Sequence, residues 1–298
     1  MESMTRIEQF GWRGEVAPGI GRVVSSHGDY FHLVCNEAEG EILARRKKSV
    51  FQYRRREERV VGGQSLVSSK RADSNVDNMN PLTGDFVRFR YNAQGESLIT
   101  ELLPRFSHFE RKDANARRKS QTLAVNFDTL FVMMSLNEDF STARIDRYLT
   151  LAEDIGEAEV VVVLTKVDLR EPGDEEYIAD LVETIDGRAK LLEISSLTGE
   201  GLDRVNEYVK PGRTLAFIGS SGVGKSTLLN TLAGEEWAAT QDVQEWSGRG
   251  RHTTTSRELV MLPSGAMVID TPGIREIGLI GEVEEVRAKG VSTHRWRS

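Results

Sequence analysis

One run of eight residues restricts the possible folds of this chain: Gly219-Ser220-Ser221-Gly222-Val223-Gly224-Lys225-Ser226. The run fits the pattern G-x-x-x-x-G-K-[ST], follows the apolar segment TLAFI and precedes the helical segment KSTLLNTL. Glycines let such a loop wrap a phosphate with its N–H groups, and the following helix adds the positive end of its dipole. The run therefore predicts a strand, a phosphate-binding loop and a helix, rather than a plain strand-to-helix corner.

The phosphate loop predicts roles for its neighbours as well. We expect Lys225 to reach the β- and γ-phosphates of a nucleotide, Ser226 to place its hydroxyl on Mg²⁺, and Thr227 to join the nucleotide-binding set. Asp270 ends the strand AMVI and is expected to hold Mg²⁺ through water, while the N–H of Gly273 meets the γ-phosphate. Alone, the sequence DTPG reads equally well as an ordinary turn.

Two further segments predict recognition of guanine. Thr165-Lys166-Val167-Asp168 follows the strand VVVVL and resembles the Asn-Lys-x-Asp pattern, in which the carboxylate accepts two hydrogen bonds that adenine cannot offer. Thr165 stands where asparagine is usual. Because its hydroxyl makes fewer hydrogen bonds than an amide, we expect the base to be bound more weakly. Ser195 and Ser196 follow the strand KLLEI and are expected to present a backbone N–H to the guanine oxygen.

A polar segment between the phosphate-loop helix and the next strand reads GRGRHTTT, over residues 248–255. A GTPase places there a switch loop with a threonine that binds Mg²⁺ only when the γ-phosphate is present. Three threonines compete for this role, and Thr254 is favoured; the alternative is a flexible polar loop.

Strands and helices alternate from residue 123 to about residue 280, which predicts a parallel sheet covered on both faces. The guanine motifs at 165–168 and 195–197 precede the phosphate loop, whereas ordinary GTPases have the reverse order. Each motif nevertheless follows its own strand, and chain termini that lie close together permit such a rearrangement. The predicted fold is an α/β, circularly permuted P-loop GTPase domain.

The N-terminal segment has a different pattern of apolar residues and turns. Short apolar runs broken by turns predict a small β-barrel of the oligonucleotide-binding type over residues 1–104, followed by a basic linker over 105–122. Residues 1–120 hold 21 Lys and Arg against 16 Asp and Glu, although the whole chain carries a net charge of −7. The basic residues form runs at 45–48, 54–59 and 111–119, which favours a nucleic-acid partner over a merely solvated surface.

Together, the permuted motif order, the β-rich N-terminal segment and GRGRHTTT resemble the bacterial ribosome small subunit-dependent GTPase A (RsgA or YjeQ) family. The segments VNFDTLFVMMSLNEDFSTARIDRYL and VIDTPGIREIGL are similar too, so the resemblance covers about residues 15–280. It implies an rRNA-binding barrel, binding to the small ribosomal subunit, a role in its late maturation, and subunit-stimulated hydrolysis of GTP to GDP and phosphate. It also implies that His252 orients water, so the expected catalytic set is His252, Lys225 and Thr254.

The last 18 residues, 281–298, depart from this family, which usually carries a zinc module of cysteines and a histidine. Cys35 is the one cysteine of the chain, so no zinc ligands of that kind are present and Mg²⁺ is the expected metal. The departure keeps open a second reading, an RNA-binding module whose GTPase domain is truncated and hydrolytically impaired. A P-loop ATPase or kinase is disfavoured by Asp168 and DTPG.

The remaining expectations concern location and assembly. The N-terminus, MESMTRIEQFGW, has no apolar stretch of signal-peptide length, and the longest apolar runs are too short to span a membrane. We expect a cytoplasmic monomer without a membrane partner.

Overall fold

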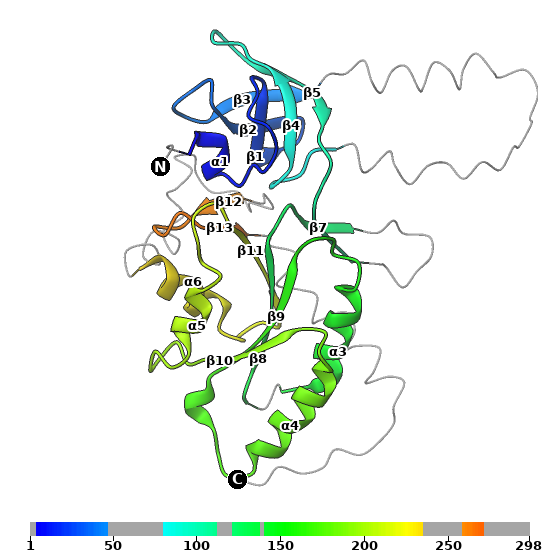
Figure 1. The fold of residues 1–298 in the computed structure, drawn as a ribbon, viewed down its shortest axis with the longest axis vertical. Coiled ribbons are helices and arrows are strands. Elements are labelled where there is room, and N and C mark those ends of the chain that lie inside the picture. The colour runs from blue at the N-terminus through cyan, green and yellow to red at the C-terminus, as the bar shows by residue number, and fades with distance from the viewer. Residues whose placement is uncertain (1–3, 47–79, 112–120, 138–139, 235–257, 271–298) are drawn as a thin grey trace, which may run out of the picture.

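The computed structural model describes residues 4–46, 80–111, 121–137, 140–234 and 258–270. Figure 1 shows a small β-barrel at one end of the molecule and a larger α/β part at the other. No helix in these ranges is long and apolar enough to cross a membrane.

The N-terminal part is a closed barrel of five strands. They are β1 (Ile20–His27), β2 (Tyr30–Cys35), β3 (Ile42–Arg46), β4 (Phe86–Arg90) and β5 (Ser97–Leu102). The strands pair in the order β1-β2-β3-β5-β4, and β4 closes the barrel by pairing antiparallel with β1. Because side chains alternate across a strand, one set, including Phe31, Leu33 and Phe89, fills the interior. A short helix, α1 (Arg6–Gln9), precedes the barrel.

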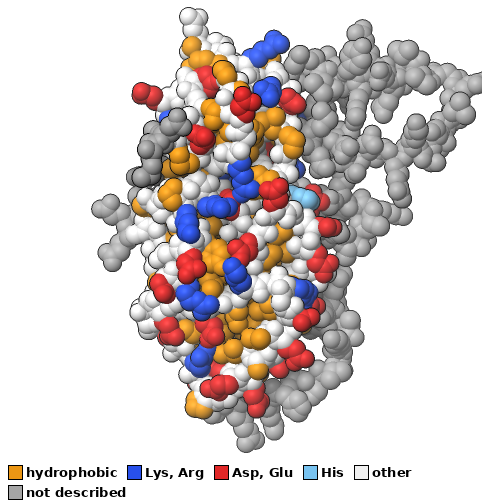
Figure 2. Space-filling model, in the orientation of Figure 1, with side chains coloured by type: hydrophobic (Ala, Val, Ile, Leu, Met, Phe, Trp, Pro, Cys, Tyr) orange, Lys and Arg blue, Asp and Glu red, His pale blue; other side chains and the backbone are white. Residues whose placement is uncertain are grey.

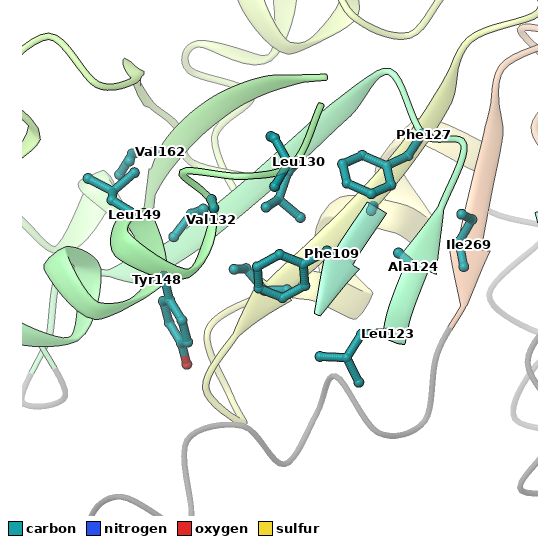
Figure 3. Close-up of a cluster of buried hydrophobic side chains, with 14 of the residues drawn as sticks. Phe109, Leu123, Ala124, Phe127, Leu130, Val132, Tyr148, Leu149, Val162 and Ile269 are labelled. Atoms are coloured by element: carbon teal, nitrogen blue, oxygen red, sulfur yellow. The ribbon is translucent and has the colours of Figure 1, made fainter. Parts of the chain in front are cut away.

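Strands β6 (His108–Arg111) and β7 (Gln121–Val125) form a separate antiparallel pair after the barrel. Figure 3 shows Phe109 of β6 with Leu123 and Ala124 of β7 in a cluster of buried apolar side chains. The described part of the predicted linker, 105–122, therefore contains strand structure. The prediction followed the charged composition of this range, whereas the alternation that buries Phe109 decides its structure.

The α/β part has six strands in the described ranges, and five of them run parallel. They are β8 (Thr129–Ser135), β9 (Glu159–Thr165), β10 (Lys190–Glu193), β11 (Thr214–Gly219), β12 (Glu258–Met261) and β13 (Met267–Asp270). They pair in the order β10-β9-β8-β11-β13-β12, and β12 is antiparallel to β13. The predicted α/β fold with a parallel sheet is confirmed.

Four helices and one 3₁₀ turn connect these strands. They are α3 (Thr142–Leu151), η2 (Val167–Leu169), α4 (Asp174–Ile185), α5 (Leu202–Asn206) and α6 (Lys225–Ala233). The hydroxyl of Ser141 accepts a hydrogen bond from the N–H of Arg144 and caps α3. Three acidic residues begin α4, where they complement the helix dipole.

Apolar residues of the central strand β8 alternate between the two faces of the sheet. Leu130 and Val132 belong to a buried cluster with side chains of α3 and α4, whereas Phe131 and Met133 belong to a second cluster with α5 and α6. Figure 1 shows α3 and α4 on one side of the strands and α5 and α6 on the other. This two-sided burial explains the nearly continuous apolar strands in the sequence.

Charges of both signs are interspersed on the face of the molecule shown in Figure 2. Arg45 and Arg46 lie on β3 of the barrel, Arg45 with its side chain 55% exposed. The remaining side chains of the three basic runs lie outside the residues whose side chains the structure describes. The expected basic RNA-binding surface therefore has only these two described members.

Candidate nucleotide-binding site

The predicted nucleotide-binding segments meet at one edge of the parallel sheet. β11 ends at Gly219, β9 ends at Thr165, β13 ends at Asp270, and Ser195 follows β10 by two residues. Since β9, β10, β11 and β13 run in the same direction, their carboxyl ends lie at the same edge. Ligands of open α/β sheets bind at this edge.

The phosphate loop depends on glycine at two positions for different reasons. A Cβ on Gly219 would lie 2.7 Å from the carbonyl oxygen of Met133 on β8. Only glycine therefore allows the end of β11 to lie this close to the β8 backbone. Gly224 has φ of 97° and directly precedes α6, a backbone conformation that side chains disfavour. Val223 is 1% exposed and anchors the loop in the core, while Ser221 and Gly222 are exposed at its tip.

Lys225 begins α6 and folds its side chain back over the phosphate loop. Its Nζ donates hydrogen bonds to the carbonyl oxygens of Gly219, at 2.7 Å, and Ser220, at 2.8 Å. The ammonium group is thereby held within the loop rather than extended into solvent. Ser226 and Thr227 follow in the first turn of α6, and both are exposed. A cation and two hydroxyls therefore flank the loop and the N-terminus of α6.

The segment 165–168 turns sharply at the end of β9. Lys166 adopts the left-handed conformation, with φ of 59° and ψ of 36°, which few residues other than glycine adopt. Val167 is 6% exposed and packs in the core, so the turn leaves Asp168 exposed. Within the described residues no hydrogen bond or ion pair occupies the Asp168 carboxylate. Its oxygens are available to accept hydrogen bonds from a base.

Thr165 joins this segment to the phosphate loop. Its hydroxyl is 2.7 Å from the carbonyl oxygen of Val223 and 3.3 Å from that of Met134. One hydroxyl has one proton to donate, and the shorter distance assigns it to Val223. The side chain is only 3% exposed, so water does not compete for the bond. The hydroxyl at this position therefore has a structural partner that the sequence did not reveal.

Ser195 and Ser196 lie beside the 165–168 segment. The N–H of Val167 donates to the carbonyl oxygen of Ile194 at 3.3 Å, which links the two loops. Ser195 is fully buried, and its hydroxyl accepts hydrogen bonds from the N–H groups of Leu197 and Thr198. Ser195 thus shapes the turn, whereas Ser196 is half-buried and nearer to solvent.

The remaining predicted site residues fall outside the description. His252, Thr254 and Gly273 lie beyond the described ranges, and Asp270 is described only by its backbone at the end of β13. In the portion that the structure covers, no group of three or more His, Cys, Asp or Glu side chains could hold a metal ion. Of the expected Mg²⁺ ligands, only Ser226 is placed with its side chain.

A buried network near the barrel also escaped sequence reasoning. Arg22 lies on β1 and is 1% exposed. The available signal was a charged residue inside the apolar strand IGRVV, because an arginine at a buried strand position needs several hydrogen-bond partners.

Comparison with known proteins agrees with this geometry. A profile of the RsgA GTPase family matches residues 102–280, which is more than half of the chain. The chain belongs to the RsgA GTPase family. It is 36% identical over 277 residues to the small ribosomal subunit biogenesis GTPase RsgA 2 of Lactiplantibacillus plantarum, covering 91% of this chain and 70% of that protein.

Other family members align over different shares of their length. RsgA of Leptospira interrogans is 36% identical and covers 89% of this chain, which spans 66% of that protein. RsgA 2 of Vibrio vulnificus is 46% identical over 196 residues, or 66% of this chain and 54% of that protein. The chain thus spans between about half and seven tenths of these relatives.

Two solved structures share the fold. The crystal structure of YjeQ from Thermotoga maritima superposes with a TM-score of 0.59 at 25% identity, covering 87% of this chain and 76% of that one. The structure of YloQ, described as a circularly permuted GTPase, gives a TM-score of 0.51 at 21% identity, covering 85% and 70%. The predicted circularly permuted GTPase fold with a barrel before it is confirmed.

Proposed function

We propose that this chain hydrolyses GTP to GDP and phosphate and acts in the maturation of the small ribosomal subunit. The observation that carries the proposal is the contact between the two halves of the nucleotide site: the Thr165 hydroxyl donates to the Val223 carbonyl oxygen of the phosphate loop. A phosphate-binding loop and the exposed Asp168 carboxylate are thereby fixed at one edge of one sheet. The relatives' names, small ribosomal subunit biogenesis GTPase, supply the ribosomal partner.

Each residue of the candidate site has a distinct task in this proposal. Backbone N–H groups of the loop and the N-terminus of α6 bind phosphate oxygens, and the Lys225 ammonium neutralises charge on the β- and γ-phosphates. The Asp168 carboxylate selects guanine, since it accepts hydrogen bonds from N1–H and the exocyclic amino group. Mg²⁺, held by Ser226 and, through water, by Asp270, would neutralise developing phosphate charge.

The residues assigned to catalysis beyond the phosphate loop remain proposals from the sequence. His252 is proposed to orient the attacking water, and Thr254 to bind Mg²⁺ when the γ-phosphate is present. The N–H of Gly273 is proposed to meet the same phosphate. The described strands support their assignment, because β12 begins at Glu258 and β13 ends at Asp270, and these two residues pair with each other.

The barrel supports the proposed contact with rRNA. On β2 and β3, Tyr30 pairs across the strands with Arg45, and His32 pairs with Leu43. Tyr30 is 45% exposed, and Arg45 also reaches solvent, so an aromatic ring and a guanidinium lie side by side on the outer face. Aromatic rings stack on bases and arginines bind phosphates, which is the combination that single-stranded RNA requires.

A pelleting assay with purified small ribosomal subunits tests the proposal. The full chain, loaded with a non-hydrolysable GTP analogue, is mixed with subunits at about 50 and about 200 mM salt, a range over which several phosphate contacts weaken binding strongly. We expect binding that falls with salt, and weaker binding after Arg45, Arg46, Lys47 and Lys48 are all changed to Glu. GTP turnover without subunits should stay nearly constant in that variant.

Two outcomes of these measurements would contradict the proposal. Binding that is absent at both salt concentrations, or indifferent to the four reversals, would assign the GTPase another partner. GTP turnover that is absent in the unmodified chain would favour the alternative, an RNA-binding module with an impaired GTPase domain. That alternative is not favoured by the names of the relatives, which are GTPases.

We also propose that the protein is cytoplasmic and monomeric, which fits a ribosomal partner.

A further inference from the structure

Arg22 connects four segments of the chain from a position inside the molecule. It lies on barrel strand β1 and is 1% exposed. Its guanidinium donates to the carbonyl oxygens of Phe10, at 2.6 Å, Gly84, at 3.2 Å, and Asn126, at 2.7 Å. It also donates to the Thr214 hydroxyl at 2.9 Å. Phe10 and Gly84 belong to the N-terminal part, whereas Asn126 and Thr214 belong to the α/β part.

The carboxylates of Asp85 and Asp128 lie near enough to act on the charge of Arg22, although each forms ion pairs with other arginines. Burial lowers the pKa of the guanidinium to about 9, and the nearby Asp128 and Asp85 act in the opposite direction. Asp85 is fully buried and accepts two hydrogen bonds from Arg105, each 2.7 Å long. Asp128 accepts from the N–H of Thr214 at 2.7 Å. A buried guanidinium whose three nitrogens all donate hydrogen bonds has a fixed orientation, because Nε, Nη1 and Nη2 are each held by a partner.

Asn126 adds a second attachment at the same place. Its backbone is left-handed, with φ of 52°, and its side chain is fully buried. The amide nitrogen donates to the carbonyl oxygen of Gly84 at 3.1 Å, and the amide oxygen accepts from the N–H of Phe106 at 3.1 Å. An unfavourable backbone conformation persists only where the surroundings hold it in place. These two hydrogen bonds, together with those that the Asn126 backbone makes with Ser107 and Arg22, hold Asn126 in this conformation.

The contacts of Arg22 and Asn126 form a junction between the barrel and the α/β part. This junction lies at the start of β11, the strand whose end leads into the phosphate loop. Thr214 is the first residue of β11, and Gly219, the first residue of the phosphate loop, is the last. Five steps of about 3.3 Å place the two roughly 16 Å apart along a rigid central strand. A second connection runs beside it: Ser25 of β1 pairs with Glu258 of β12, and Glu258 pairs with Asp270 at the end of β13.

We propose that Arg22 is a positioning residue that holds the barrel on the base of the phosphate-loop strand, so that subunit binding to the barrel accelerates GTP hydrolysis only while this junction is intact. The inference rests on the proposed function and adds that the small subunit stimulates hydrolysis, as the family resemblance implies. Packed side chains, hydrogen-bond networks and rigid secondary structure can carry coupling between distant sites, and the junction with β11 combines a buried hydrogen-bond network with a central strand. A barrel joined only by flexible chain would bind RNA without affecting the phosphate loop.

The experiment compares substitutions at the two ends of one hydrogen bond in the full chain. Arg22→Met removes every hydrogen bond of the guanidinium, and Thr214→Val removes only the side-chain acceptor on β11. Thr214→Ser keeps that acceptor and is the matched control. Arg88→Met is a second control, because Arg88 is a half-exposed arginine of barrel strand β4 that pairs with Glu101. Each variant is measured for basal GTP turnover, turnover with small subunits, and subunit binding by pelleting.

We expect Arg22→Met and Thr214→Val to bind subunits and to keep basal turnover within about twofold, while the ratio of stimulated to basal turnover falls by about 5-fold to 150-fold, the usual range of coupling between sites. Both controls should keep the ratio. If Arg22→Met does not fold, Thr214→Val decides the outcome. A ratio that stays at the unmodified value in Thr214→Val, whether or not basal turnover falls, overturns the inference. An unmodified chain that subunits do not stimulate also overturns the inference, and pelleting with basal turnover then decides separately whether the proposed function holds.

Discussion

Replacing Thr165 by valine removes one hydroxyl from the nucleotide site and almost nothing else. Valine has nearly the shape of threonine, so the packing at the end of β9 is retained. The change deletes the donor that lies 2.7 Å from the Val223 carbonyl oxygen. Thr165 is 3% exposed and Val223 is 1% exposed, so water cannot replace the donor. The phosphate loop then carries a buried carbonyl group that has lost its side-chain partner.

The expected cost follows from that burial. A buried acceptor left without its partner costs about 1–3 kcal/mol. If the whole cost falls on the conformation that binds nucleotide, GTP affinity decreases by about 5-fold to 150-fold, because 1.4 kcal/mol corresponds to a factor of about ten. Thr165→Ser keeps the donor and should stay within about threefold of the unmodified chain, the loss of one methyl group being the smaller change.

Titration with a fluorescent GTP analogue measures both variants, and thermal unfolding of the same samples separates affinity from stability. The reasoning requires valine and serine to differ. Equal affinities for Thr165→Val and the unmodified chain, with equal stability, would refute the claim that this hydroxyl supports the phosphate loop. Equal losses in both variants would assign the effect to packing instead.

Four other substitutions test the rest of the site, and a fifth serves as a control. Lys225→Ala should lower GTP turnover, measured as phosphate release, by orders of magnitude, because charge stabilisation contributes most to the catalysis of phosphoryl transfer. Unchanged turnover in Lys225→Ala would refute the site. Ser226→Ala should raise the Mg²⁺ concentration needed for half-maximal turnover. Asp168→Asn should weaken GTP binding and improve binding of xanthosine triphosphate in a competition assay, whereas equal competition by ATP in the unmodified chain would refute guanine selection. Gly219→Ala should destabilise the fold by about 1–3 kcal/mol in denaturant unfolding, since the added Cβ would lie 2.7 Å from the Met133 carbonyl oxygen. Gly222→Ala is the control for backbone strain alone, because its added Cβ would meet open space while its φ is 75°.

Local patterns in the sequence predicted the α/β fold. The apolar strands at Glu159–Thr165 and Thr214–Gly219 stand out because a parallel sheet buries both faces, and that burial leaves an uninterrupted apolar run. The phosphate loop is recognisable because its glycines and Lys225 act through neighbouring backbone, within one strand-to-helix turn. The same locality explains why β6 was missed: the charged residues around Phe109 dominate its short segment, and only the packed core shows that this side chain is buried.

What the sequence indicated by itself is therefore the pattern that lies within a few consecutive residues: a loop of the phosphate-binding type, a carboxylate after a strand, and the permuted order of the two. Tertiary structure decided the interactions between residues far apart along the chain. Thr165 meets Val223 across 58 positions, and Arg22 meets Thr214 across 192. No local pattern encodes such a contact, because a hydroxyl or a guanidinium acquires its partner only when separate strands are brought together. In the sequence, Thr165 stood in place of the usual asparagine; in the fold, its hydroxyl holds the phosphate loop.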